Sequence, residues 1–220
     1  MKKIFKIFFV LIIIMVVLLY KKVIYVEYIS QAGYPTGCES VSATMVLKYY
    51  GFDMTVDKFI DNYLNKNNLE KMDGILYGPH PNESFVGNPR NENSFGCFSP
   101  VIENAFERIV DEKYDVVNET GLSLDLIALK YITRGIPVLI WATIDMNESY
   151  PSTGWTVKNT GEKFMWRANE HCLVLVGFDF FNYYFNDPYN NKGLVKYEKS
   201  IVRQRYSELG KQAIIIKPNT

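Results

Sequence analysis

The sequence predicts an α+β fold in which helices occupy the first half of the domain and strands cluster toward the C-terminus. Apolar residues of the first half recur at three- to four-residue spacing, which is typical of amphipathic helices. Within residues 23–220, the longest continuous apolar runs come late, at 136–144, 171–177 and 213–216, and such runs are typical of buried strands. This order differs from the regular strand–helix alternation of α/β proteins.

Residues 1–22 are predicted to be a membrane anchor or a signal segment. Residues 7–20 form an unbroken apolar run, preceded by Lys2, Lys3 and Lys6. With a small extension the run reaches the short end of what a spanning helix needs. No small-residue cleavage site follows, which favours an uncleaved anchor over a removed signal. The slight excess of basic residues before the run favours a single-pass protein with its domain outside, or a secreted protein if the segment is cleaved.

Residues 23–220 are predicted to form one domain, since they are numerous enough for one sizeable core. The chain has 24 basic and 24 acidic residues, and five of the lysines lie in residues 1–22, which hold no acid. The remainder therefore carries 19 basic against 24 acidic residues. This acidic balance argues against a nucleic-acid partner, which would require a basic patch. The sequence does not predict an oligomeric state.

A cysteine lies in the first turn of the first predicted helix of this domain. Thr36 and Glu39 have capping-box spacing, and Gly51 provides a stop. Cys38 would then be the second helical residue, where unpaired backbone N–H groups and the helix dipole favour a thiolate. The alternative is a small buried cysteine, as free cysteines usually are. Gln31, seven residues upstream, can offer a side-chain N–H₂ group to an oxyanion.

Three further helices and four strands follow this segment. The helices begin with a capping hydroxyl and span 56–64 after Thr55, 99 to about 110, and 124–131 after Ser123. The strands are expected at 136–144, 171–177, 183–187 and 213–216. Residues 65–98 and 145–168 lack strong periodicity and are expected to be loops that shape a substrate cleft. Trp155 and Trp166, in the second of these regions, could line that cleft or simply cover the core.

A histidine and an aspartate are expected to meet in a hairpin. His171 opens one apolar strand, and the strand 183–187 follows after a short link, so an antiparallel pair brings Asp187 alongside His171. The carboxylate could accept a hydrogen bond from one imidazole nitrogen and leave the other for a nucleophile. Asn186 is the nearest rival, because strand alternation lets only one of the two face His171. A histidine with a purely structural role is the alternative, and His80 is expected to be an exposed loop histidine.

Several segments carry a family resemblance in the same order along the chain. QAGYPTGCESVSATMVLKYYG (31–51) resembles the peptidase C39-like family of papain-like cysteine peptidases, as do FVGNPR (85–90), GIPVLIWATI (135–144), NEHCLVLVGFD (169–179) and YYFNDP (183–188). The resemblance implies a papain-like cysteine peptidase fold, with an N-terminal helix carrying the cysteine packed on a C-terminal antiparallel sheet. It implies that Cys38 is the nucleophile and His171 the base. It further implies that Asp187 is the orienting acid and Gln31 the oxyanion donor. No phosphate-binding loop motif is present, so the chain resembles the free-standing branch.

We therefore expect a cysteine peptidase that cleaves peptide or isopeptide bonds and has a peptide or protein substrate as its partner. The chemistry needs no metal and no cofactor. Two alternatives stay open: an acyltransferase or amidase with the same residues, and a non-catalytic, membrane-anchored binding module.

The chain has three cysteines, Cys38, Cys97 and Cys172. In an exported protein this odd number leaves either one free thiol, with a Cys97–Cys172 bridge, or three free thiols. Cys172 alternates with His171 along its strand, so we expect it to lie away from the catalytic face.

Overall fold

Helix α2 (Cys38–Tyr49) lies against a seven-stranded sheet in the computed structural model, which describes residues 2–219. The sheet has the order β12-β11-β10-β7-β13-β6, and β1 also pairs with β10. Every pairing within it is antiparallel. Its strands are β1 (Lys22–Val23), β6 (Tyr114–Asn118), β7 (Val138–Thr143), β10 (Glu170–Phe178), β11 (Asn182–Asp187), β12 (Gly193–Glu198) and β13 (Ala213–Pro218).

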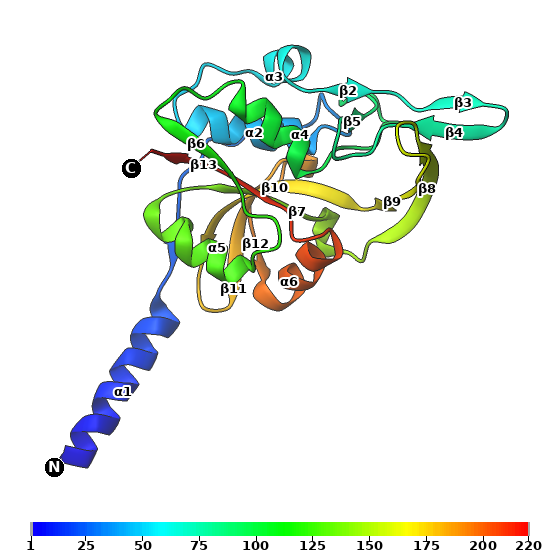
Figure 1. The fold of residues 1–220 in the computed structure, drawn as a ribbon. Helices are drawn as coiled ribbons and strands as arrows, with labels where there is room; N and C mark the ends of the chain where they lie inside the picture. The colour runs from blue at the N-terminus through cyan, green and yellow to red at the C-terminus, as the bar shows by residue number, and fades with distance from the viewer. Residues whose placement is uncertain (1, 220) are drawn as a thin grey trace.

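Helices cover both faces of this sheet. Figure 1 shows α2 and α4 on one side and α5 and α6 on the other. The bounds of the remaining domain helices are α3 (Val56–Asn62), α4 (Ser99–Glu107), α5 (Leu124–Lys130) and α6 (Lys199–Glu208), with short 3₁₀ turns η1 (Ile132–Arg134), η2 (Ile144–Met146) and η3 (Tyr189–Asn191). The α+β prediction is confirmed.

Helix α2 and strand β10 form the centre of the core. All residues of α2 from Cys38 to Leu47 are buried, and β10 is buried along its whole length. The two elements pack directly on each other. Close packing leaves little freedom for residues at the ends of buried elements. The helix start and the strand start that carry the candidate residues are therefore held in place relative to each other.

The two regions predicted to be loops contain a second sheet, so the prediction that they lack strands is wrong, whereas their role in a substrate cleft stays a prediction. It has the order β3-β4-β8-β9, with bounds Glu70–Met72, Ile75–Gly78, Tyr150–Val157 and Lys163–Ala168, and β2 (Lys66–Asn67) pairs separately with β5 (Phe85–Val86). The strands are short, and a register shift between Pro151 and Gly154 interrupts β8, so alternation is weak in the sequence. Trp155 and Trp166 form a small core with Val86 beneath this sheet.

The predicted helix starts are confirmed at two caps. Thr55 accepts a hydrogen bond from the Lys58 N–H at 3.1 Å, and Ser123 accepts one from the Leu126 N–H at 3.4 Å. Gly135 ends the η1 turn in the left-handed conformation, with φ 79°.

The capping box predicted at the start of α2 is wrong. Gly37 occupies the N-cap position without a side-chain cap, and Cys38 is the first helical residue. The Thr36 hydroxyl donates to the Asn91 carbonyl at 3.0 Å instead of capping. The Glu39 carboxylate is buried in the core, where it accepts from another segment of the chain. Hydrogen bonds to distant segments of the chain have therefore replaced the two bonds of the capping box between Thr36 and Glu39.

Helix α1 (Lys2–Leu19) projects away from the body of the protein (Figure 1). Among residues 2–219, no helix combines the length and the apolar character needed to cross a membrane. The anchor predicted for residues 1–22 therefore has no support in the structure.

We predict that Thr55→Ala lowers the free energy of unfolding by about 1 kcal/mol, because it removes the side-chain cap of α3. Ser200→Ala is the matched control, since Ser200 is an exposed residue in the first turn of α6, whose start has no side-chain cap. Urea titration of both variants measures the difference. Equal losses in the two variants would contradict the assignment of the cap.

Candidate active site

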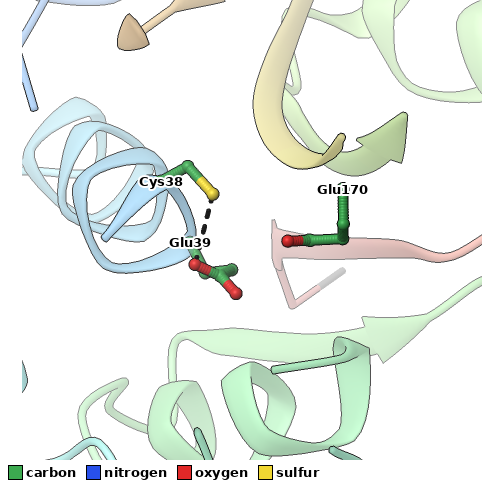
Figure 2. A group of neighbouring side chains, drawn as sticks. All are labelled: Cys38, Glu39 and Glu170. Atoms are coloured by element: carbon green, nitrogen blue, oxygen red, sulfur yellow. Dashed lines mark hydrogen bonds between the residues drawn. The ribbon is translucent and has the colours of Figure 1, made fainter. Parts of the chain in front are cut away.

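Cys38 is the first residue of α2, and its side chain is buried, with 6% of its surface exposed. The Sγ atom donates a hydrogen bond to Oε2 of Glu39 at 3.3 Å, as Figure 2 shows. The candidate nucleophile therefore has a carboxylate, rather than an imidazole, as its hydrogen-bonding partner.

The segment before α4 also forms a hydrogen bond with the Glu39 carboxylate. Its Oε1 atom accepts a hydrogen bond from the Cys97 N–H at 2.6 Å. The Cys97 carbonyl in turn accepts from Nε1 of Trp141 on β7 at 2.9 Å. At Gly96 a Cβ atom would lie 2.5 Å from Oε1 of Glu39. Only glycine leaves room at this position for the carboxylate.

Glu170 brings a second carboxylate to the same place from the start of β10. It is 9% exposed, and its Oε1 atom has no hydrogen-bonding partner among the described residues. Figure 2 shows its carboxylate pointing toward Cys38 and Glu39. One ligand atom from each of the three side chains lies within 4.8 Å of the other two.

The surroundings of these three groups favour their protonated forms. Burial raises the pKa of Cys38 well above its usual value, and the charges of Glu39 and Glu170 raise it further. Burial also raises the pKa of Glu39 to about 7, although the N–H donors around it oppose the change. Burial and the neighbouring Glu39 raise the pKa of Glu170. Cys38 is thus a thiol at neutral pH, and the protonated form of Glu170 is favoured.

The expectation that the helix start makes Cys38 a thiolate is therefore wrong for the resting structure. A helix dipole contributes about 0.3–1 kcal/mol at an exposed N-terminus. Full burial can shift a pKa by about 3–5 units, which corresponds to a larger free energy. Because Cys38 is buried beside two acids, desolvation outweighs the dipole.

The predicted hairpin is confirmed and joins His171 to Asp187. Strands β10 and β11 are antiparallel, with a register shift between Leu175 and Gly177. Nε2 of His171 and Oδ1 of Asp187 lie 2.8 Å apart, and both side chains are almost fully buried. Within the part of the chain that the structure describes, no hydrogen bond is made by Nδ1 of His171.

Two further contacts orient the Asp187 carboxylate. It accepts from the Tyr189 N–H at 3.0 Å, and the Lys192 ammonium lies 3.4 Å from its Oδ2. Burial alone would raise the pKa of Asp187, but the bond from His171 and these neighbours lower it below its usual value. Asn186 points elsewhere and donates to the Val26 carbonyl at 2.8 Å, so the choice of Asp187 over its rival is correct.

Gln31 lies beside the end of the same hairpin. Its backbone N–H donates to the Pro188 carbonyl at 3.1 Å. Its side chain is buried, with Nε2 at 3.5 Å from the Pro35 carbonyl and Oε1 without a partner. A hollow of about 330 Å³ opens here, lined by Gln31, residues 30, 32 and 35, and residues 189–191.

The structure thus brings three of the four predicted residues, Gln31, His171 and Asp187, to one end of the hairpin. Among the described residues no hydrogen bond links Cys38 to His171. Glu170, the residue before His171, offers a carboxylate oxygen within 4.8 Å of the Cys38 sulfur, so the thiol lies beside Glu170.

All three cysteines are free, so the Cys97–Cys172 bridge considered from the sequence does not form. The Cys97 N–H donates a hydrogen bond to the Glu39 carboxylate, and the Ser42 hydroxyl donates one to the Cys172 carbonyl at 3.1 Å. Cys172 was expected to lie away from the catalytic face. That expectation stays a prediction, and Cys172 is one of the groups that raise the pKa of Cys38.

His80 is half-buried against the Phe164 ring, with ring centres 4.9 Å apart, rather than exposed. The short strands β4 and β9 that pack around it were not predicted.

Glu39 and Glu170 are the site residues that sequence reasoning missed. Glu39 was interpreted as a capping residue, and Glu170 received no role. The available signal was an acid next to each candidate catalytic residue, in segments that are otherwise apolar and predicted to be buried. Acids are almost never fully buried without a partner or a function.

The Peptidase_C39 like family matches residues 23–214. The chain belongs to this family. The uncharacterized protein YvpB of Bacillus subtilis (strain 168) is 26% identical to it over 181 residues, covering 82% of this chain and 69% of YvpB.

Solved structures agree with the family. A candidate C39-like peptidase from Bacillus anthracis superposes with a TM-score of 0.78 and 28% identity, covering 90% of this chain and 98% of that one. The peptidase domain of Streptococcus ComA, a bifunctional ABC transporter of a quorum-sensing pathway, has a TM-score of 0.51 and 13% identity. That match covers 89% of this chain and 100% of the ComA domain, and shows a shared fold.

We predict that Gly96→Ala destabilises the protein by about 1–3 kcal/mol, because the new methyl group overpacks the site against the Glu39 carboxylate. Gly33→Ala is the control, since a Cβ there meets nothing within 4 Å. Thermal and urea unfolding of both variants measure the effect. A loss in Gly96→Ala no larger than in Gly33→Ala would contradict the packing described.

We also predict that Cys38 in the free protein reacts slowly with iodoacetamide at pH 7. Its raised pKa keeps the thiolate fraction small, so the rate should climb with pH without levelling off below pH 9. Glu170→Gln should shift the profile to lower pH by removing one acid. Peptide mapping by mass spectrometry follows Cys38 separately from Cys97 and Cys172, and a plateau below pH 9 would contradict the direction of the pKa shift.

Proposed function

We propose that the protein is a cysteine peptidase in which Cys38 attacks the carbonyl carbon of a peptide or isopeptide bond. The observation that carries this proposal is the buried 2.8 Å contact between His171 and Asp187, which orients an imidazole at one end of the hairpin. Family membership and the likeness to C39-like peptidase structures support the same chemistry.

In the proposed mechanism His171 is the base. When the Asp187 carboxylate accepts from the Nε2–H group, Nδ1 carries a lone pair and can take the Cys38 proton. The thiolate attacks, and the tetrahedral intermediate collapses to a thioester as His171 returns the proton to the leaving amine. Water then hydrolyses the thioester to release the acid and restore the thiol.

Gln31 and the start of α2 would stabilise the oxyanion. The first N–H groups of a helix have no intrahelical partner, so the Cys38 N–H is available to an oxyanion. Gln31 is anchored beside the hairpin by its bond to the Pro188 carbonyl, and its amide is incompletely bonded. A 180° turn of the amide would direct its N–H₂ group to where the unpaired Oε1 now lies.

Cys38 must leave Glu39 before it can meet His171. The thiol donates to a carboxylate in the free protein, and catalytic contacts are often poorly aligned until substrate binds. We propose that substrate in the hollow beside Gln31 accompanies a rotation of the Cys38 side chain toward His171. Until then the nucleophile is stored in its protonated form.

We predict that the full chain cleaves members of a peptide library and that Cys38→Ala and His171→Ala abolish cleavage. Gln31→Ala should reduce the rate about a hundred- to a thousand-fold, the usual cost of removing one oxyanion donor. His80→Gln, the substitution of the other histidine, is the control and should retain the rate. Mass spectrometry of the library products measures cleavage.

Cleavage that persists in Cys38→Ala would exclude Cys38 as the nucleophile. Equal losses in His80→Gln and His171→Ala would show that the effect is one of folding rather than of proton transfer.

A further inference from the structure

The buried set formed by Cys38, Glu39 and Glu170 lacks a positively charged partner. Among the ion pairs of residues 2–219, none involves either glutamate. Oε1 of Glu170 has no hydrogen-bonding partner, although the residue is only 9% exposed and its carboxylate points into the set (Figure 2). An unsatisfied buried polar group is unfavourable, and more so if it is charged. A cation bound among these groups would supply the missing partner.

We propose that this set is a binding site for a thiophilic divalent cation, with Zn²⁺ as the best match. The ligands are Sγ of Cys38 and one carboxylate oxygen each from Glu39 and Glu170. Zinc accepts thiolate and carboxylate ligands, and three protein ligands leave its fourth position for water. Mg²⁺ and Ca²⁺ favour oxygen ligands, so the thiolate disfavours them.

The spacing of the ligand atoms fits such an ion. With zinc bonds of about 2.3 Å to sulfur and 2.0–2.2 Å to oxygen, tetrahedral angles separate the two ligand atoms by roughly 3.5 Å. Sγ of Cys38 and Oε2 of Glu39 lie 3.3 Å apart. All three ligand atoms lie within 4.8 Å of one another, so a small inward shift of Glu170 completes the set.

The neighbouring structure also suits a bound ion. The Cys97 N–H fixes the orientation of the Glu39 carboxylate at 2.6 Å, and such bonds to ligands strengthen metal sites. Glu170 also lines a hollow of about 450 Å³, together with Trp166 and Gln212, which provides a route from solvent.

Binding would regulate the proposed peptidase, and this consequence rests on the proposed function. Zn²⁺ forms a bond to the Cys38 sulfur, while the thiol proton and the Glu170 proton pass to solvent, with no change in oxidation state. The metal-bound sulfur then has no free lone pair for attack, and the Cys38 side chain cannot rotate toward His171. The cation would act as an inhibitor that a chelator removes.

The test is a titration of the metal-free full chain with Zn²⁺ and with Cd²⁺, whose thiolate complexes absorb in the ultraviolet. We expect one equivalent to bind by equilibrium dialysis and elemental analysis, with a cadmium–thiolate signal. Cys38→Ser should abolish the signal, and Glu170→Gln should weaken binding at least about ten-fold, no less than the loss of an outer-shell partner. Cys172→Ser is the thiol control and should keep both. Circular dichroism confirms that each variant is folded.

Absence of binding, or binding unchanged in folded Cys38→Ser and Glu170→Gln, would overturn the proposal. Mg²⁺ that competes equally with Zn²⁺ would also overturn it, because the thiolate would then contribute nothing. If the metal binds as expected but no peptide is cleaved by the metal-free chain, the site stands and the proposed function fails.

Discussion

The packing of the first turn of α2 against the start of β10 is the constraint on which the site depends. Both elements are buried along nearly all their length, so Cys38 and Glu39 are withdrawn from water together with Glu170. In water the helix start would favour a thiolate. Here desolvation dominates, and the thiol shares its surroundings with two acids whose pKa values are raised. The fold therefore keeps the proposed nucleophile buried and protonated.

The β10–β11 hairpin positions the other residues of the candidate site, His171 and Asp187. Antiparallel pairing brings Asp187 to His171, and the turn after β11 supplies a backbone N–H to the same carboxylate. Gln31 is tied to this turn through Pro188. Glu170 and His171 are neighbours in sequence, but Glu170 lies beside Cys38 whereas His171 is hydrogen-bonded to Asp187. The proposed reaction and the proposed metal site would therefore compete for one sulfur atom.

Local signals predicted much of this structure. Short segments of sequence were enough to predict the caps at Thr55 and Ser123, the apolar strands, and the hairpin that pairs His171 with Asp187. Contacts between residues that lie far apart in the chain could not be predicted from the sequence. The inward turn of Glu39 depends on the Cys97 N–H, 58 residues away in the chain, and the second sheet depends on pairing β4 with β8. Two acids that meet only after folding could not be recognised as a pair from their spacing.

Covalent trapping of Cys38 is the decisive measurement of whether His171 activates this thiol. A peptide-based epoxide inhibitor of the E-64 type binds as a substrate does before it alkylates, so it reports on the activated rather than the resting thiol. We predict a single adduct on Cys38 by intact-protein and peptide mass spectrometry, absent in Cys38→Ala and formed much more slowly in His171→Ala. An adduct on Cys97 or Cys172, or labelling of Cys38 at an unchanged rate in His171→Ala, would contradict it.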